Sequence, residues 1–355
     1  MDKRWKKLGN LMVQWSTVVQ PNDRVMIAMS EVETYPLVHA IYEAVIEAGA
    51  YPQVQFLSES LRHVFLTQGN TEQQSWVPEI ESSGMEWADV YFGLRGGHNM
   101  SIHADVPADQ LTANQVAMGK VSRLRWQKTR WCLSRVPNPA FAQQAETEFK
   151  SLMDMYFNAC FLNWEVESKR WRALANQLEH GQLIRILGKD TDLSFSVEGR
   201  QWMVFDGKIN MPDGEIFTAP VNKTLNGHIY FENPGVLGGR LMHDIRLCWK
   251  NGELIEATSS SNQDYLHQIL RSDEGSNKLG EFALGMNPHV DRFCNDILID
   301  EKIGGTIHIA LGRAYPECEG TNQSNIHWDI VKDLRSEGVV TLDDQAILED
   351  GVVVL

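Results

Sequence analysis

The sequence has no long apolar run and no excess of positive charge, and each absence excludes a class of protein. No stretch of the 355 residues approaches the roughly 20 consecutive apolar residues of a transmembrane helix, and the first residues lack the apolar segment of a secretory signal. The formal net charge of -15 argues against a basic surface for nucleic acid. We therefore expect neither a membrane nor a nucleic-acid partner.

Two further motifs are missing. The five cysteines are scattered and contain no CxxC pair, so the sequence indicates neither a disulfide framework nor a thiolate zinc site. Widely spaced, reduced thiols are typical of the cytoplasm, which is the location we expect. No G-x-G-x-x-G turn follows any strand candidate, so a dinucleotide site is not expected.

The first half of the chain alternates short apolar stretches with amphipathic ones. Leu37, Ile41 and Val45 form one helical stripe that Gly49 ends. Strands that are separated by helical crossovers form a parallel, three-layered α/β sheet, which we expect with a helical connector over residues 1–180. The strand candidates are residues 23–29, 51–56, 88–94 and 130–136.

Beyond Gly181 the pattern changes to short alternating strands, and Asn251–Gly252 predicts a tight hairpin turn. We expect residues 181–355 to form a strand-rich α+β domain that binds metal. Within it, residues 272–285 (SDEGSNKLGEFALG) predict a short helix with Ser272 as its N-cap and Gly285 at its end.

The stretch NQSNIHWDIVKD, residues 322–333, places a histidine and an aspartate two positions apart among bulky apolar residues. In a strand, His327 and Asp329 share one face, and Trp328 lies on the other. The two side chains are either a metal-binding pair or a local His–Asp hydrogen bond. So short a pattern leaves both interpretations open.

Three more polar residues of this half stand in apolar surroundings. Glu215 follows a Pro-Asp-Gly turn, Glu281 lies between glycine and phenylalanine, and His308 points away from the isoleucines beside it in a predicted strand. Each alone could be a turn residue, a surface charge or a core histidine. A buried charge is costly unless it is paired or bound to metal, so a shared metal centre is the simplest interpretation. The expected ligands are Glu215, Glu281, His308, His327 and Asp329.

The residue types of this set indicate the metal. Carboxylates and imidazoles without thiolates suit catalytic Zn, Mn, Co or Fe better than a structural zinc, which disfavours a non-enzymatic binding module. Five ligands exceed the usual needs of one ion, and two ions about 3.5–4 Å apart activate water and polarise a carbonyl. Tyr315, beyond a turn at Gly312, is either a donor to the developing oxyanion or a packing residue.

Four segments resemble successive signatures of the aminopeptidase T family of metallopeptidases, in order and in spacing. They are residues 210–220 (NMPDGEIFTAP), 280–288 (GEFALGMNP), 300–317 (DEKIGGTIHIALGRAYPE) and 322–334 (NQSNIHWDIVKDL).

The resemblance implies that the five expected ligands form the metal centre, with Tyr315 in catalysis. Glu281 is the expected group to handle a proton of the water if it is not purely a ligand. It implies a hydrolase that releases the N-terminal residue of a small peptide or cleaves a small amide. Two divalent ions (Zn, Co or Mn) are the expected cofactors, and a homodimer is the expected assembly.

The same superfamily includes mononuclear iron enzymes that open dihydroxypyridine rings with oxygen, which is the alternative function. A single Fe(II) would then be held by His308, His327 and Asp329 as two histidines and one carboxylate. His98, after the glycine pair of LRGGHN, would act as a base. His98 and His103 are candidate substrate-binding residues, although exposed loop histidines are common.

Overall fold

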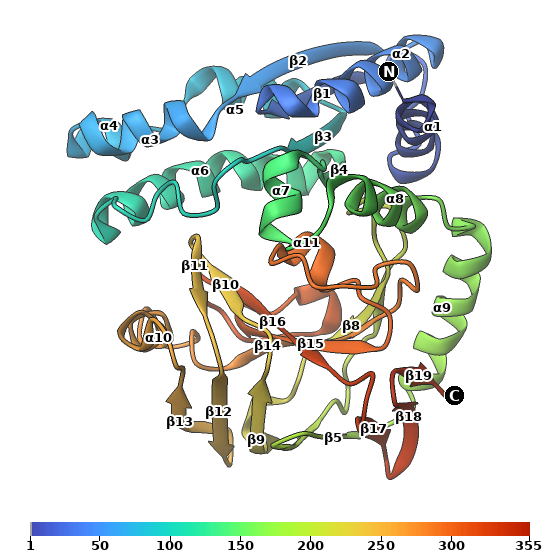
Figure 1. Ribbon diagram of the computed structural model, residues 1–355, viewed down its shortest axis with the longest axis vertical. Coiled ribbons are helices and arrows are strands. Elements are labelled where there is room, and N and C mark those ends of the chain that lie inside the picture. Colours follow the sequence, from blue (N-terminus) through green and yellow to red (C-terminus); the bar gives the residue numbers. More distant parts are fainter. Residues whose placement is uncertain (1) are drawn as a thin grey trace. The chain divides into compact units, whose positions relative to one another are not determined.

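The computed structural model describes residues 2–355, which divide into two units. The first unit is built on a parallel β-sheet. This unit extends to Phe161 and includes Gly207–Pro212. Its sheet has the order β2-β1-β3-β4 (Figure 1). The strands are β1 (Arg24–Ser30), β2 (Tyr51–Leu57), β3 (Val90–Arg95) and β4 (Arg130–Arg135). All three pairings are parallel, which confirms the predicted α/β sheet.

Helices connect these strands where apolar residues recur at helical spacing. Leu37, Ile41 and Val45 are fully buried on α2, and Gly49 follows the helix with a φ of 77°. Among the described residues, no helix is long and apolar enough to cross a membrane. The helices are α1 (Lys3–Leu11), α2 (Tyr35–Glu47), α3 (Glu59–Gln68), α4 (Thr71–Gln74), α5 (Glu79–Trp87), α6 (Ala108–Lys128), α7 (Pro139–Gln144) and α8 (Phe149–Cys160).

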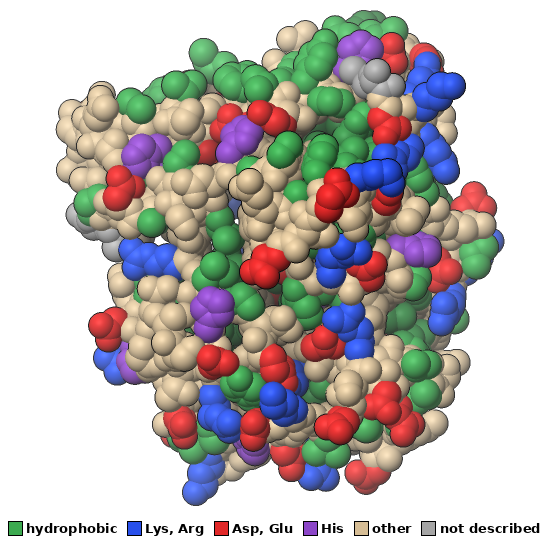
Figure 2. All heavy atoms as spheres, viewed as in Figure 1, with side chains coloured by type: hydrophobic (Ala, Val, Ile, Leu, Met, Phe, Trp, Pro, Cys, Tyr) green, Lys and Arg blue, Asp and Glu red, His purple; other side chains and the backbone are tan. Residues whose placement is uncertain are grey.

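The edge strand β2 carries exposed apolar side chains. Tyr51, Val54 and Phe56 are each about half exposed, and Tyr42 and Ile46 are exposed on the neighbouring helix α2. Figure 2 shows hydrophobic side chains gathered at the surface of this unit, where α2 and β2 lie in Figure 1. An unpaired strand edge beside apolar surface is a template for association with another chain.

The second unit, Leu162–Asp206 with Asp213–Leu355, is rich in antiparallel strands, as predicted. One sheet has the order β16-β15-β14-β8-β7 and another the order β13-β12-β9-β6-β5-β17-β18-β19. The strands of the first are β7 (Met203–Phe205), β8 (Glu215–Thr218), β14 (Leu279–Gly285), β15 (Thr306–Gly312) and β16 (His327–Asp333). The expected division into residues 1–180 and 181–355 stays a prediction.

The other strands of this unit form the longer sheet and the pair β10-β11. Asn251 and Gly252 have positive φ in the turn between β12 and β13, where the hairpin was predicted. The other strands are β5 (Leu183–Gly188), β6 (Thr191–Ser196), β9 (Asn226–Phe231), β10 (Gly235–Leu237), β11 (Arg240–Met242), β12 (Ile245–Lys250), β13 (Glu253–Thr258), β17 (Val339–Leu342), β18 (Gln345–Glu349) and β19 (Val352–Val353). The helices are α9 (Trp164–Leu178), α10 (Gln263–Leu270) and α11 (Ile297–Asp300).

The predicted helix over residues 272–285 is wrong. Ser272 lies in a turn, and Leu279–Gly285 is the strand β14, with Glu281 as its third residue. β14 lies between β15 and β8, and every one of its residues is buried. A strand that is covered on both faces loses the alternation of apolar and polar residues from which strands are recognised.

Gly312, the last residue of β15, allows β15 and β16 to approach closely. Its φ is 101°, it pairs with His327, and a Cβ atom there would lie 2.3 Å from the Ile326 carbonyl oxygen. An L-residue at this position meets both an unfavourable backbone conformation and a backbone atom that cannot move aside.

We expect Gly312→Ala to lower the free energy of unfolding by about 1–3 kcal/mol, because both penalties apply. Thermal denaturation measures the loss. Gly199→Ala is the matched control, since Gly199 also has a positive φ, of 72°, but a Cβ atom there meets nothing within 4 Å. Equal losses in the two variants would contradict the role of the close approach.

Candidate metal centre

Four neighbouring strands carry the five predicted ligands. His327 and Asp329 lie on β16, His308 on β15, Glu281 on β14 and Glu215 on β8. These strands are adjacent in the sheet, so residues far apart in the sequence meet in space. The structure brings all five together, whichever role each has.

The pairing register explains how the polar groups find room. Ala310 pairs with Glu281 on one side and with Asp329 on the other. Its methyl group fills little of the space between the two carboxylates. Ile309 and Leu311, the neighbours of Ala310 in the strand, are fully buried. The alternation predicted for β15 therefore separates an apolar face from the face that holds the polar centre.

The candidate ligand atoms form two groups, each compact enough to hold one ion. Within each group the ligand atoms lie within 4.8 Å of one another. One group consists of Glu215, Glu301 and His308, and the other consists of Glu281, His327 and Asp329.

Glu281 faces both groups. Its Oε1 lies 3.4 Å from His308 Nε2, and its Oε2 lies 3.2 Å from His327 Nε2. A carboxylate that presents one oxygen to each of two imidazoles occupies the position of a bridge between two ions. The other contacts stay within one group: His308 Nε2 lies 3.4 Å from Glu215 Oε2, and His327 Nε2 lies 3.4 Å from Asp329 Oδ1.

The two groups differ in access to solvent. Glu215, Glu301 and His308 are all buried, so we name them the inner group. The side chains of His327 and Asp329 are 15% and 12% exposed, so Glu281, His327 and Asp329 are named the outer group. A substrate can reach an ion in the outer group more directly than one in the inner group.

Sequence reasoning missed Glu301 and Lys302. Lys302 is fully buried, and its Nζ lies 2.8 Å from Glu215 Oε1, 2.8 Å from Glu301 Oε1 and 3.2 Å from Asp213 Oδ1. Asp213 is fully buried too. The signal was the run Asp300–Lys302, three consecutive charged residues that end three residues before the strand that carries His308. Such a run is usually solvated, and only the fold shows that it is buried.

A backbone hydrogen bond orients His327. Its Nδ1 donates to the carbonyl oxygen of Arg313 at 2.7 Å, which leaves Nε2 directed at the carboxylates of Glu281 and Asp329. Ligating histidines commonly donate their other ring nitrogen in this way, and the bond fixes the tautomer.

The charges of the centre shift the pKa values of its members. Burial acts to lower the pKa of His308, but the adjacent Glu281 and the charges of Glu215 and Asp329 raise it to about 9. Burial raises the pKa of Glu215 to about 8, although Lys302 acts in the opposite direction. A metal ligand must be deprotonated, so an ion that binds at neutral pH displaces protons from this centre.

Tyr315 packs beside the centre. Its ring centroid lies 5.2 Å from that of His327 and 5.3 Å from that of Phe217. Burial, reinforced by the negative charge of Glu281 and Asp329, raises the pKa of the Tyr315 hydroxyl well above its usual range. The hydroxyl therefore keeps its proton at neutral pH and can donate a hydrogen bond.

His98 and His103 belong to the first unit. His98 Nε2 lies 2.8 Å from Glu33 Oε2, and His103 Nε2 lies 2.7 Å from Glu59 Oε2. Each ring therefore has a carboxylate partner within its own unit. Their role in substrate binding stays a prediction.

The residues present fit divalent metal ions. Glu215 Oε2 and both ring nitrogens of His308 are buried and form no hydrogen bond, and the contacts of His308 Nε2 with the carboxylate oxygens of Glu215 and Glu281 are 3.4 Å long. Such atoms are costly unless a ligand satisfies them. Carboxylate and imidazole donors within 4.8 Å of one another are what Zn, Mn or Co require.

Comparison with known proteins agrees with this chemistry. The sequence profile of the family described as thermophilic metalloprotease (M29) matches residues 1–351. The chain is 24% identical over 396 aligned residues to aminopeptidase 2 from Geobacillus stearothermophilus, covering 95% of this chain and 94% of that protein.

Two solved structures share the fold. Wild-type AmpT from Thermus thermophilus superposes with a TM-score of 0.88 at 21% identity, covering 99% of each chain. The 2,5-dihydroxypyridine dioxygenase from Pseudomonas putida KT2440 superposes with a TM-score of 0.63 at 15% identity, covering 100% of this chain and 98% of that one. The profile match spans nearly the whole sequence, and the chain belongs to the M29 family of metalloproteases.

Proposed function

We propose that this M29 metallo-aminopeptidase releases the N-terminal residue of a small peptide with two divalent ions. The inner group would hold one ion and the outer group the other, and Glu281 lies between the two groups. The observation that carries the proposal is the position of Glu281, which directs its two oxygens at histidines of different groups. Zn, Co and Mn are the candidate ions, given the donor set.

Bound ions of this kind supply an activated water at neutral pH and polarise the scissile carbonyl. The chain supplies the proton transfers and the orientation. Burial acts to raise the pKa of Glu281, but its imidazole neighbours lower it and keep the group ionised, so Glu281 would accept a proton of the attacking water if one of its oxygens is not engaged by an ion. Tyr315, protonated and packed against His327, is placed to donate to the developing oxyanion.

The alternative, a mononuclear iron enzyme that opens a dihydroxypyridine ring, rests on a shared fold. It requires His308, His327 and Asp329 to hold a single Fe(II). In the structure His308 lies in the inner group, whereas His327 and Asp329 lie in the outer one. Carboxylates accompany both imidazoles, which favours hydrolysis with two ions.

A homodimer and a cytoplasmic location stay predictions. The exposed apolar side chains of β2 and α2 offer a surface on which a second copy could pack. The scattered cysteines form no disulfide within the described residues, which agrees with a reducing compartment.

The charge of the centre supports two ions rather than one. Asp213, Glu215, Glu281, Glu301 and Asp329 are five carboxylates, and Lys302 is one ammonium, so the formal net charge is -4 when all are ionised. Two divalent ions balance that charge, whereas one leaves half of it uncompensated in a buried site. Lys302 supplies the ammonium already included in this count, and it pairs with Asp213, Glu215 and Glu301.

Removal and return of metal test the proposed function. We expect exhaustive chelation to abolish hydrolysis of an aminoacyl anilide, and Zn, Co or Mn to restore it with two ions per chain. Metal analysis by mass spectrometry and a colorimetric assay measure the two quantities. Unchanged hydrolysis after chelation, or full activity with a single bound iron, would overturn the proposal.

Glu281→Gln separates the two chemistries. If Glu281 bridges two ions, the variant should bind close to one ion per chain, and hydrolysis should fall by at least about 10²–10³. The amide keeps the size of the side chain, so a folding defect is not expected. A variant that keeps two ions and near-native hydrolysis would defeat the bridging role. His98→Ala is the comparison, because it should cost more than Glu281→Gln only if the iron alternative holds.

Lys302→Met should destabilise the metal-free protein more than the metal-loaded one. Breaking a buried ion pair costs about 3–5 kcal/mol, and bound ions would supply the charge that the variant lacks. Thermal unfolding with and without chelator measures the difference. Lys332→Met is the matched control, because Lys332 is also fully buried but pairs with Glu232 at 2.7 Å, outside both metal groups. An equal loss in both states for Lys302→Met would refute the compensation.

A further inference from the structure

The face of the five-stranded sheet that carries the metal centre has an apolar end. Glu215 and Phe217 are two positions apart on β8, so they share this face. Phe205 on β7 pairs with Glu215, and Ala283 on β14 pairs with Phe217, so both belong to the same face. The polar centre therefore borders directly on apolar side chains near the β7 end of the sheet.

Two phenylalanine rings form a platform at this end. The ring centroids of Phe205 and Phe217 lie 4.6 Å apart with an interplanar angle of 71°, which is an edge-to-face contact. Phe217 is buried, whereas Phe205 is partly buried. The charge distribution of the rings favours this arrangement, so each ring limits the orientation of the other. We name Phe205 and Phe217 the aromatic platform.

Tyr315 packs on the aromatic platform. Its ring centroid lies 5.3 Å from that of Phe217 and 6.4 Å from that of Phe205. The same ring lies 5.2 Å from that of His327, a member of the outer group. The other buried members of this cluster have small side chains, which leave room for the tyrosine ring: Ala219, Ala283, Ala314 and Cys318.

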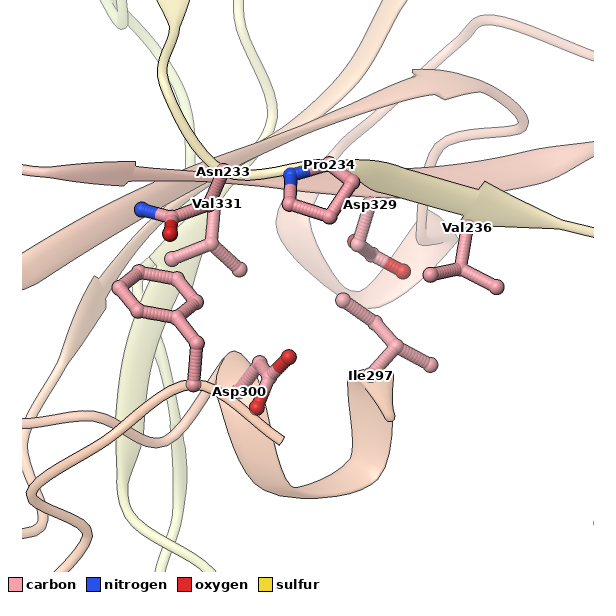
Figure 3. Close-up of a pocket in the computed structure, with 8 residues that line it drawn as sticks. Asn233, Pro234, Val236, Ile297, Asp300, Asp329 and Val331 are labelled. Atoms are coloured by element: carbon pink, nitrogen blue, oxygen red, sulfur yellow. The ribbon is translucent and has the colours of Figure 1, made fainter. Parts of the chain in front are cut away.

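The centre has a different neighbour near β16, at the other end of the sheet. Asp329 borders a small cavity there, with room for about one water molecule. Figure 3 shows this cavity, which Asp329 and Val331 reach from β16 and Asp300 from α11. Tyr315 does not line it. The ring contacts of Tyr315 lie instead with the aromatic platform and His327.

We propose that Phe205 and Phe217 are positioning residues for the reaction, because they hold the Tyr315 ring so that its hydroxyl reaches the carbonyl oxygen of the scissile bond. The inference rests on the proposed aminopeptidase function and adds two residues to its machinery. Neither the expected ligands nor the metal groups include them.

A donor to the oxyanion must be in place before the charge develops. Misplacing a catalytic group by about 1 Å can cost about 10²-fold in rate. Tyr315 lies three residues after the end of β15 and outside the strands, so the register of the sheet does not set its side-chain angles. Contacts with neighbouring rings set them instead, and the aromatic platform supplies two of these contacts.

Phe205 also touches the charged part of the centre. Lys302 Nζ lies 5.6 Å from the centroid of the Phe205 ring, within the range of a cation–π contact. Removal of this ring acts on Lys302 as well as on Tyr315. A test of the positioning role therefore has to measure bound metal together with the rate.

A double-mutant cycle in the metal-loaded enzyme tests the assignment. We expect Tyr315→Phe to lower kcat for an aminoacyl anilide by about 10²-fold, and Phe205→Leu to lower it by about tenfold with KM changed less than about twofold. If Phe205 acts through the Tyr315 hydroxyl, Phe205→Leu should cost less than about twofold in the Tyr315→Phe background. Phe217→Leu should follow the same pattern. Equal losses in both backgrounds overturn the positioning role.

Two measurements do not depend on turnover. Metal analysis should find the same number of ions per chain in wild type and Phe205→Leu, which excludes an effect through Lys302. In calorimetry of the zinc-loaded proteins, the phosphonic acid analogue of leucine, a tetrahedral anion, should bind Phe205→Leu about tenfold more weakly than wild type. L-Leucine, with a planar carboxylate, should bind both alike. Loss of ions, or an equal effect on the two compounds, overturns the assignment.

Phe195→Leu is the matched control. Phe195 is fully buried in the same unit, and its ring lies 5.3 Å from that of Phe282. Phe282 lies between Glu281 and Ala283 on β14, so it points to the other face of the sheet. Phe195→Leu should lower thermal stability at least as much as Phe205→Leu and leave kcat unchanged. A comparable fall in kcat would assign the effect to lost packing and overturn the positioning role.

The outcomes separate this inference from the proposed function. A wild type that hydrolyses aminoacyl anilides with two ions, but whose losses are additive in the cycle, overturns the positioning role and leaves the function standing. An unchanged kcat in Tyr315→Phe removes the donor and overturns the inference, while hydrolysis with two ions still stands. A wild type without any such hydrolysis overturns the proposed function and this inference with it.

Discussion

The burial of negative charge in one small region is the constraint on which the centre depends. Carboxylates that leave water lose a large solvation energy, which only nearby positive charge can restore. Lys302 supplies a fixed part of that charge by contacting Asp213, Glu215 and Glu301. The neighbouring carboxylates also raise the pKa values of His308 and His327, so the same negative charge favours protonated imidazoles.

The five-stranded sheet gives this charged site its rigidity. Hydrogen-bonded strands hold Glu215, Glu281, His308 and Asp329 at set positions, while Asp213 and the buried pair Glu301 and Lys302 lie outside these strands. Small residues decide the spacing: Ala310 leaves room between two carboxylates, and Gly312 lets β16 approach β15. A geometry that is set by backbone pairing is pre-organised for ions before any ion arrives.

The two groups of the candidate metal centre differ in their burial. The inner group is sealed among buried side chains, whereas the outer group adjoins both solvent and the cavity at Asp329. The outer group is therefore the more accessible of the two candidate metal groups. The same strand, β16, carries Asp329 and then Val331 of the cavity wall, so ligand and pocket share one rigid element.

The sequence by itself determined the strands around His308, His327 and Asp329 and the parallel sheet of the first unit. It also determined the residue types of the candidate metal centre. Alternation and residue chemistry are local properties, so they can be read without the fold. Local sequence failed at Glu281, where a strand buried on both faces has no alternation and was taken for a helix. Glu301, Lys302 and the cavity at Asp300 were beyond its reach. Whether a charged run is solvated or buried, and which walls enclose a space, depends on distant segments meeting, and only the tertiary structure decides that.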